Sequence, residues 1–192
     1  MEFTGKNQIK LDRLLSELDK LVLQFISILE RHTGYVIVSG YVSILFGRAR
    51  ATEDVDVFIK ELNREEFTSL YGDLVKGGFW CLNTEDDEEA YGYLSDGLAV
   101  RFAVKDEVIP NFEVKYAKKK LAKQAFEEAL TVIIDGGKLR VSSLERHVAF
   151  KKYFLKSDKD LEDAAHIEKV FEGRLNKEKI TMVRREIEDE EA

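Results

Sequence analysis

The sequence predicts an α+β fold in which helices flank a mixed sheet and a helical subdomain follows at the C-terminus. Short apolar runs typical of strands alternate with amphipathic stretches typical of helices up to about residue 142. From Ser143 onward the pattern is almost entirely helical. Because no repeat or low-complexity linker divides the 192 residues, we expect a core over 1–142 and a helical subdomain over 143–192.

The composition is ordinary for a globular protein. Hydrophobic residues make up 44% and charged residues 35% of the chain, which suits a folded domain with a sizeable core. The single cysteine, Cys81, excludes an internal disulfide. The sequence shows no apolar stretch long enough to span a membrane and no cleavable leader pattern. We therefore expect a cytoplasmic protein with no membrane partner.

The first long element that the pattern predicts is an amphipathic helix over 10–31. Its apolar residues recur at alternating spacings of four and three, which gives one continuous apolar face. They are Leu11, Leu15, Leu18, Val22, Phe25 and Leu29. Two interpretations stay open: this helix lies across the domain's own sheet, or it forms the interface of a homodimer.

The remaining elements follow from alternation of apolar and polar residues, from glycine breaks and from capping residues. The predicted strands are 35–38, 54–59, 79–82, 97–105 and 111–116, and 131–141 is a hairpin through Gly136 and Gly137. The predicted helices are 41–47, a helix capped by Asn63 that ends near 75, 118–129, and about three segments after Ser143. The acidic run 84–90 is either a loop or the start of a helix.

The strongest functional signal lies in residues 39–57. Asp54 and Asp56 stand two apart on a predicted strand, so their side chains point to the same face. Two carboxylates this close are costly unless a cation lies between them, and Mg²⁺ or Mn²⁺ prefers such oxygen ligands. Ser39 and Gly40 form a turn into a short helix, where unpaired backbone N–H groups suit phosphate oxygens.

Glu113 is the best candidate for a third carboxylate. It stands between the apolar residues Phe112 and Val114 on a predicted strand, so it lies on the opposite face from them. Together with Asp54 and Asp56 it could hold two ions that clamp the attacking and leaving oxygens of a phosphoryl transfer. The alternatives are an ordinary surface position for Glu113 and a solvated acidic strand face for the two aspartates.

These motifs resemble the nucleotidyltransferase superfamily related to DNA polymerase β. The shared pattern is a Gly-containing turn, an apolar helix and then R-x-T-x-D-x-D, here Arg50, Thr52, Asp54 and Asp56. The chain is most similar to a small prokaryotic group that includes abortive-infection-type toxin nucleotidyltransferases. A helical segment over 144–167 is similar to that group's second motif, which by position gives Glu145, Lys151, Lys159, Asp160 and Asp163. The resemblance covers about residues 35–167.

The resemblance implies an enzyme that transfers a nucleoside monophosphate from an NTP to a hydroxyl and releases pyrophosphate. The acceptor would be an RNA 3′ end, a protein side chain or a small molecule, and a toxin–antitoxin role is also implied. Asp54, Asp56 and Glu113 would bind Mg²⁺ and carry catalysis. The residues that would bind the nucleotide are Ser39, Gly40, Arg50, Thr52, Lys151, Asp160 and Asp163.

Several of these assignments have alternatives. Arg50 and Thr52 could instead brace the loop before the strand, whereas Asp160 and Asp163 could hold Lys151 in place. Lys152 rivals Lys151 on sequence alone, and the basic run 115–123 could steer an anionic acceptor such as RNA or simply be solvated. The three histidines, His32, His147 and His166, have no ligand spacing, so a zinc site is not expected.

Two departures from the family pattern keep a second function open. Ser39 stands where the family has glycine, and Glu113 stands where it usually has aspartate. A side chain at residue 39 either crowds a triphosphate or donates a hydroxyl to it, and a glutamate needs its backbone set further back. The alternative to an enzyme is therefore a non-catalytic member of the same fold that binds a nucleotide or a partner protein.

Overall fold

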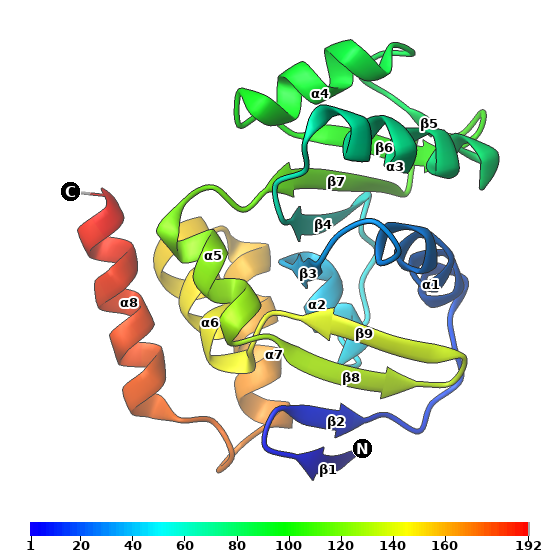
Figure 1. Ribbon diagram of the computed structural model, residues 1–192. Coiled ribbons are helices and arrows are strands. Elements are labelled where there is room, and N and C mark those ends of the chain that lie inside the picture. The colour runs from blue at the N-terminus through cyan, green and yellow to red at the C-terminus, as the bar shows by residue number, and fades with distance from the viewer. Residues whose placement is uncertain (192) are drawn as a thin grey trace.

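The computed structural model describes residues 1–191 and contains one mixed sheet of nine strands (Figure 1). The strand order is β1-β2-β8-β9-β3-β4-β7-β6-β5. The strands are β1 (Glu2–Gly5), β2 (Gln8–Lys10), β3 (Tyr35–Val38), β4 (Asp54–Ile59), β5 (Phe79–Cys81), β6 (Val100–Val104), β7 (Asn111–Tyr116), β8 (Leu130–Ile134) and β9 (Gly137–Val141). The predicted hairpin is confirmed, since β8 and β9 pair antiparallel.

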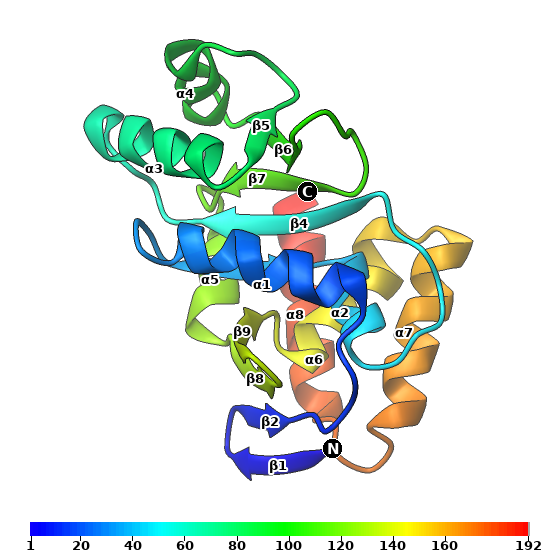
Figure 2. The same ribbon diagram turned by 90° about the vertical axis from the view of Figure 1, so that its right-hand side faces the viewer.

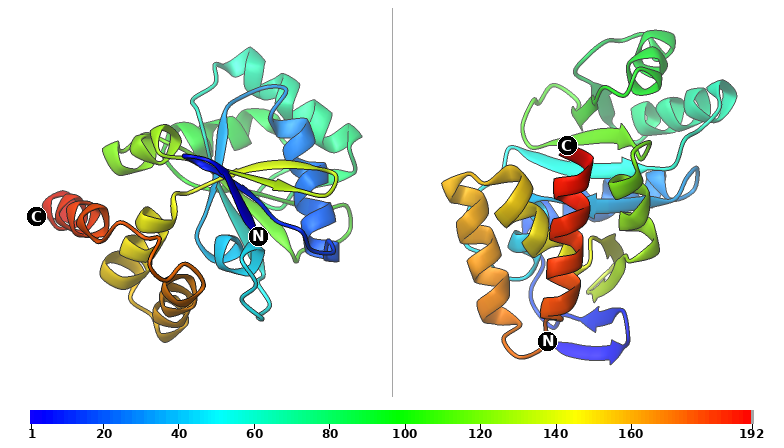
Figure 3. Two further views of the ribbon diagram at one scale, coloured as in Figure 1. Left: turned by 90° about the horizontal axis from the view of Figure 1, so that it is seen from below. Right: turned by 90° about the vertical axis from the view of Figure 1, so that its left-hand side faces the viewer.

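Helices cover both faces of this sheet. They are α1 (Glu17–Leu29), α2 (Gly40–Leu45), α3 (Arg64–Lys76), α4 (Asp87–Ser95), α5 (Lys120–Glu127), α6 (Leu144–Ala149), the π-helical turn η1 (Phe150–Leu155), α7 (Asp158–Val170) and α8 (Lys177–Glu191). Figure 2 shows α1 lying along β4 with α3 next to it, and the left panel of Figure 3 shows α6, α7 and α8 on the opposite side of the sheet. Within residues 1–191, no helix combines the length and the apolar character needed to cross a bilayer.

Helix α1 packs against the sheet of its own chain. Val22, Phe25 and Leu29 are completely buried, and the ring of Phe25 stacks on that of Phe112 in β7 with a centroid separation of 3.9 Å. Helix α1 therefore lies across the domain's own sheet, which is the first of the two interpretations that the sequence left open. Because its apolar face is used inside the domain, a homodimer through α1 would have to use its other residues, and such a dimer stays a prediction.

The predicted helix over 10–31 is wrong at its start. Residues 8–10 form β2, which pairs in parallel with β8 so that Ile9 lies beside Val132. The helix begins only after Ser16, where the Ser16 hydroxyl accepts the Asp19 N–H and the Asp19 carboxylate accepts the Ser16 N–H. The spacing of apolar residues misled the prediction because Leu11 is buried beyond the end of a strand and not on a helical face.

The acidic run over 84–90 is the start of a helix, which is one of its two predicted interpretations. Asp86 caps α4, since its carboxylate accepts the Glu88 N–H at 2.7 Å. The three predicted C-terminal segments are also present, as α6 continuing into η1, then α7 and α8. The acidic side chains of the α4 start are therefore explained by capping and solvation.

The C-terminal helices share one core with the sheet. Val148, Ile167 and Phe171 are completely buried in the main hydrophobic cluster. A separate, smaller cluster lies under α8 and contains Leu121, Ala149, Val183 and Ile187. The first group fixes α6 and α7 to the sheet, whereas α8 depends mainly on the small cluster. The proposed boundary at residue 142 stays a prediction.

We predict that Ile9→Ala lowers the free energy of unfolding by about 2–4 kcal/mol, since it empties a fully buried site between β2 and its neighbours. Leu14→Ala is the control because Leu14 is 94% exposed, and it should change stability by less than about 0.5 kcal/mol. Urea unfolding of both variants gives the comparison. Equal stability of the two variants would contradict the position of β2, with Ile9 buried, in the sheet.

Candidate active site

The parallel pairing of β4 with β7 brings the three predicted carboxylates together. Asp56 is the register partner of Glu113, and register partners on neighbouring strands point to the same face. Asp54 lies two residues before Asp56 on that face, while Val55 and Val57 are buried on the other. Alternation along the sequence predicted these three residues as a group. The pairing of β4 with β7, which the sequence could not show, brings them close together.

The carboxylate cluster carries more negative charge than its surroundings balance. The pKa of Asp56 is raised to about 6, first by burial and then by the charges of Asp54 and Glu113. A hydrogen bond from Ser39 and the charge of Lys115 oppose this rise. A site that disfavours its own ionised carboxylates gains from a bound cation, so the residues present fit a divalent metal.

Glu113 is already engaged by two cations. Arg101 on β6 donates to one carboxylate oxygen at 2.6 Å and Lys115 to the other at 2.5 Å. Burial alone would raise the pKa of Glu113, but these two partners hold it below its usual value. Across residues 1–191, no three His, Cys, Asp or Glu side chains are arranged as a finished metal site. Glu113 can therefore join Asp54 and Asp56 around an ion only by exchanging its present ion pairs.

The turn between β3 and α2 has an unusual backbone. Ser39 has φ 59° and ψ −139°, a conformation that strains a residue with a Cβ by about 1–3 kcal/mol. Glycine adopts it freely, which is a physical reason for the glycine that the family pattern has here. The Ser39 hydroxyl does not cap α2; it lies close enough to Asp56 to oppose the rise of that residue's pKa. The first departure thus places a hydroxyl beside the carboxylate cluster.

Arg50 braces this turn from the far side of the loop. Its guanidinium donates to both carboxylate oxygens of Asp163, at 3.0 and 2.8 Å, and to the carbonyl of Ala51. A Cβ on Gly40 would lie only 2.4 Å from Arg50 Nη2, so glycine is required for this approach. Thr52 has a similar role, because its hydroxyl donates to the Asp54 carbonyl at 2.9 Å. Arg50 and Thr52 therefore brace the loop before β4, which is the alternative role that the sequence left open for them.

Lys151 is buried and held by both aspartates of the second motif. Its ammonium lies 2.6 Å from Asp160 and 3.1 Å from Asp163. Asp163 is completely buried; burial would raise its pKa, but the hydrogen bonds from Arg50 and Lys151 hold it below its usual value. The aspartates therefore fix Lys151, which is the second of their two predicted roles. Its rival Lys152 pairs with Glu168 at 2.9 Å.

The other two positions of the second motif lie outside this network. Glu145 accepts the backbone N–H of Asn176 at 3.1 Å and so ties α6 to the start of α8. Lys159 is exposed on α7.

A pocket of about 350 Å³ lies beside Asp56 and reaches α5, η1 and α8. The polar residues that line it include Ser39, Asp56, Lys115, His147 and Lys151. The apolar residues that line it include Leu121, Ala122, Ala125, Phe150, Phe154, Leu155 and Ile187. Lys119, Arg146 and Glu190 also line it. The pocket thus offers both charged groups and apolar surface to a ligand.

His147 lines the pocket, a position that its sequence pattern did not predict. It is buried, its Nε2 lies 2.8 Å from the hydroxyl of Ser43 on α2, and burial followed by the nearby Lys151 charge lowers its pKa to about 3. The imidazole is therefore neutral at physiological pH. Its sequence context gave no sign of this, since His147 has no ligand-spaced partner along the chain.

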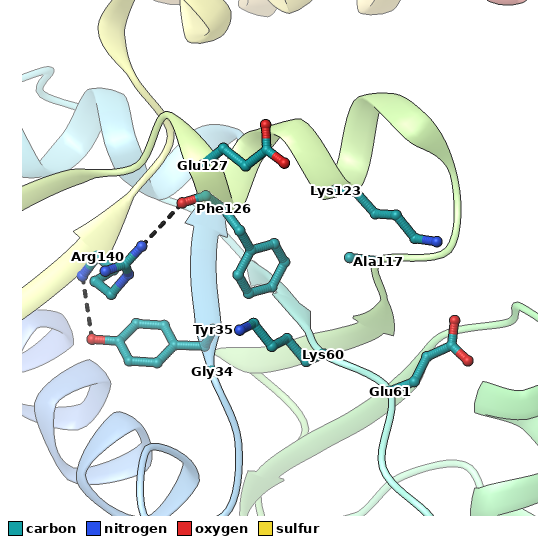
Figure 4. A pocket seen from close by; sticks show the side chains of 9 residues that line it. All are labelled: Gly34, Tyr35, Lys60, Glu61, Ala117, Lys123, Phe126, Glu127 and Arg140. Carbon is teal, nitrogen blue, oxygen red and sulfur yellow. Dashed lines mark hydrogen bonds between the residues drawn. The ribbon is translucent and has the colours of Figure 1, made fainter.

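A second cavity of about 620 Å³ lies at the far ends of β3 and β4 (Figure 4). It is lined by Gly34, Tyr35, Lys60, Glu61, Ala117, Lys123, Phe126, Glu127 and Arg140. Lys60 follows Asp56 by four residues along the strand direction, which separates the two by about 13 Å. None of the three carboxylates lines this cavity, whereas Asp56 lines the 350 Å³ pocket at the other end of the strands.

Comparison with known structures identifies the fold. No protein-family model matches the sequence, and no curated protein sequence matches it. The solution structure of the antibiotic-resistance factor ANT(2″)-Ia is similar, with a TM-score of 0.56 and 15% identity over 92% of this chain and 95% of that one. The crystal structure of ANT(2″)-Ia in complex with adenylyl-2″-tobramycin also gives a TM-score of 0.56, with 16% identity over 90% of this chain and 98% of that one.

A third similar structure is an antigenic nucleotidyltransferase-like protein from Paracoccidioides brasiliensis. Its TM-score is 0.53, with 15% identity over 89% of this chain and 87% of that one. Identities this low show a shared fold and nothing finer. The predicted nucleotidyltransferase-like mixed sheet flanked by helices is thereby confirmed.

We predict that His147 makes the protein less stable at acid pH. Its pKa is about 3 in the folded state against 6.5 for an unperturbed imidazole, so the unfolded state takes up the proton first as the pH falls below 6.5. Between pH 7 and pH 5 this group should lower the free energy of unfolding by about 2 kcal/mol. Urea unfolding of wild type and His147→Gln at pH 7, 6 and 5 measures the loss.

The His147→Gln variant should lose that part of the pH dependence, whereas the control His166→Gln should keep it. An unchanged slope in His147→Gln would show that another group is responsible.

We also predict that Gly40→Ala lowers the free energy of unfolding by about 1–3 kcal/mol, because the new methyl group meets a guanidinium that Asp163 holds in place. Gly72→Ala is the matched control, since a Cβ at that helical position meets nothing within 4 Å, and it should raise stability by about 0.5–1 kcal/mol. Thermal and urea unfolding give both values. A Gly40→Ala variant as stable as Gly72→Ala would contradict the close approach of Arg50.

Proposed function

We propose that this protein is a metal-dependent nucleotidyltransferase that transfers a nucleoside monophosphate from an NTP to a hydroxyl acceptor and releases pyrophosphate. The observation that carries the proposal is the placement of Asp54, Asp56 and Glu113 on one face of β4 and β7, with Asp56 lining the 350 Å³ pocket. The nucleotidyltransferase-like fold makes this reaction the first one to consider for the pocket.

The shape and charge of the pocket suit a nucleoside triphosphate. Such a ligand has one strongly anionic end and one flat ring, which match the cationic and the apolar residues that line the pocket. Lys115 and Lys119 line the pocket and would meet the phosphates, with Ser39 donating from the turn. The base would lie in the apolar slot that α5 and η1 line. Lys151 is held between two carboxylates, so its charge is already balanced and it would line the pocket as a fixed donor.

Asp54 and Asp56 are the residues that would hold Mg²⁺ or Mn²⁺, and Glu113 would complete the site after releasing Arg101 and Lys115. When bound, the metal would offset the charge of the phosphates and make the acceptor hydroxyl easier to deprotonate. The pKa of Asp56, raised to about 6 by burial and by its two acidic neighbours, supports a cation at this place.

The chain's own groups would perform the following steps. The acceptor oxygen forms a bond to the α-phosphorus while the bond from that phosphorus to the bridging oxygen breaks, and pyrophosphate leaves. Glu113, once it has released Arg101 and Lys115, would take the hydroxyl proton, because it lies beside Asp56 in the strand register. Arg50, fixed by Asp163, would keep the turn at Ser39 and Gly40 in place during the reaction.

The class of acceptor stays open among an RNA 3′ end, a protein side chain and a small molecule. ANT(2″)-Ia was crystallised with adenylyl-2″-tobramycin, which is an example of the last class in a protein of similar fold. The abortive-infection-type group, a toxin role and a cytoplasmic location are proposals that rest on the sequence patterns alone.

A second candidate function has one observation in its favour. Both carboxylate oxygens of Glu113 are already paired with Arg101 and Lys115, and residues 1–191 hold no ready group of three metal ligands. A protein of this fold that binds a nucleotide without turning it over would look the same. The two candidates differ in one property, the release of pyrophosphate.

The test combines binding and turnover. We expect each NTP that fits the pocket to bind wild type only with Mg²⁺ or Mn²⁺, as measured by isothermal titration. The Asp54→Ala/Asp56→Ala variant should lose this binding. The variant Glu2→Ala/Asp12→Ala is the control, because it removes two exposed carboxylates elsewhere and should bind normally.

The same proteins are then incubated with labelled NTP and cell extract. Transfer of label to one species by wild type and not by Asp54→Ala/Asp56→Ala establishes the enzyme and points to its acceptor. Metal-dependent binding without pyrophosphate release supports the non-catalytic candidate. If wild type binds no nucleotide in the presence of metal, both candidates are wrong.

A further inference from the structure

We propose that Arg101 and Lys115 form a latch that holds Glu113 away from the metal position until a phosphate group of the nucleotide takes Lys115. This inference rests on the proposed function of the pocket and concerns the regulation of its metal site. Both latch residues bind Glu113 directly, Arg101 at 2.6 Å and Lys115 at 2.5 Å, one on each carboxylate oxygen. The third carboxylate of the cluster is therefore occupied in the resting protein.

The strand order places Glu113 between two sets of partners. Strand β7 lies between β4 and β6 (Figure 1), so Glu113 has Asp56 as its register partner on one side and Arg101 on the other. Neighbouring strands lie about 4.8 Å apart, a distance that a glutamate side chain spans in either direction. The same carboxylate can therefore face the two cations, as it does here, or turn toward the aspartates.

The charges of the carboxylate cluster are unevenly shared. Arg101 and Lys115 both pair with Glu113, whereas Asp54 and Asp56 have no ion-pair partner within residues 1–191. A cation held by the two aspartates would gain a third ligand only if Glu113 turned toward it. That movement costs Glu113 its present ion pairs, so the latch opposes metal binding although the two aspartates favour it.

Lys115 connects the latch to the pocket. It lines the pocket, whereas Arg101 does not. Of the other lining cations, Lys151 and Arg146 each lie near two carboxylates, but Lys115 has only the carboxylate that it shares with Arg101. A triphosphate offers several charged oxygens to an ammonium group. Lys115 is therefore a group through which an incoming phosphate can act on Glu113.

The latch is weak enough to open. The side chains of Arg101 and Lys115 are 46% and 40% exposed, and ion pairs exposed to this degree contribute little. When a phosphate takes Lys115, Glu113 keeps a single solvated partner. A divalent cation nearby then attracts this carboxylate more strongly than one solvated guanidinium does. Phosphate binding and metal binding at this site therefore support each other.

The first test measures metal binding without a nucleotide. Mn²⁺ is the probe, and free Mn²⁺ is measured from its electron paramagnetic resonance signal. Arg101→Gln should lower the Kd for Mn²⁺ by about 2- to 5-fold, the effect expected from one exposed ion pair, because Glu113 then turns more easily. Arg101→Lys keeps the charge and should restore the wild-type Kd. Arg64→Gln is the matched control, since Arg64 is 38% exposed and pairs with Asp87 and Glu88.

A double-mutant cycle shows whether the effect passes through Glu113. In the Glu113→Gln background, Arg101→Gln should no longer change the Kd for Mn²⁺, because no carboxylate remains to be released. An undiminished gain in this background would mean that Arg101 acts through its charge alone, and this result overturns the latch.

The second test measures phosphate binding without a metal. Inorganic tripolyphosphate is titrated calorimetrically into each protein in the presence of EDTA. Glu113→Gln should lower its Kd by about 2- to 5-fold, since Lys115 is then free, and Lys115→Gln should abolish this gain. Asp54→Asn is the control, because it removes a carboxylate of the same cluster that does not pair with Lys115. Any gain from Asp54→Asn should survive in the Lys115→Gln background.

Gains in both tests that depend on Glu113 support the latch. If NTP binds with metal but Arg101→Gln has the wild-type Kd for Mn²⁺, the latch is wrong and the proposed function stands. Equal binding of tripolyphosphate by wild type and Glu113→Gln also overturns the latch alone. If wild type binds neither Mn²⁺, nor tripolyphosphate, nor any NTP, the proposed function fails together with the latch.

Discussion

The structure around the pocket depends on one buried group of charges, in which Asp163 binds Arg50 on one side and Lys151 on the other. These contacts join the loop before β4 to α7 and η1, segments more than a hundred residues apart in the chain. Loss of one partner would leave a charge buried without compensation, which typically costs about 3–5 kcal/mol. The network therefore does more to define the geometry of the turn and the pocket wall than any apolar contact near them.

In the carboxylate cluster, unlike this network, burial and the neighbouring charges are unfavourable. The sheet places Asp54, Asp56 and Glu113 on one face, and burial together with mutual repulsion raises the pKa of Asp56. Ser39 adds backbone strain at the edge of the same cluster. Unfavourable charge and strain that survive in a folded protein commonly mark a site that a ligand relieves. The network of Asp163, Arg50 and Lys151 holds the turn beside this cluster in place.

Most of the fold followed from local patterns, and the failures have a common cause. Alternation and capping revealed β4, α3 and the β8–β9 hairpin because their signals lie within a few residues. The N-terminal hairpin escaped because β2 gains its stability from parallel pairing with β8, which no local pattern shows. In the pocket, the carboxylates could be predicted from their spacing. The neutral His147 and the apolar wall of η1 could not, since both depend on which helices pack together.

The pairing of β2 with β8 has a consequence for how the chain is made. Ile9 is synthesised 123 positions before its register partner Val132. Residues 2–10 therefore have no strand partner beyond their own hairpin until β8 has been made. A two-stranded hairpin is only marginally stable alone, so this edge of the sheet can close only after β8 has emerged. Until then an unpaired strand edge is open to other nascent chains.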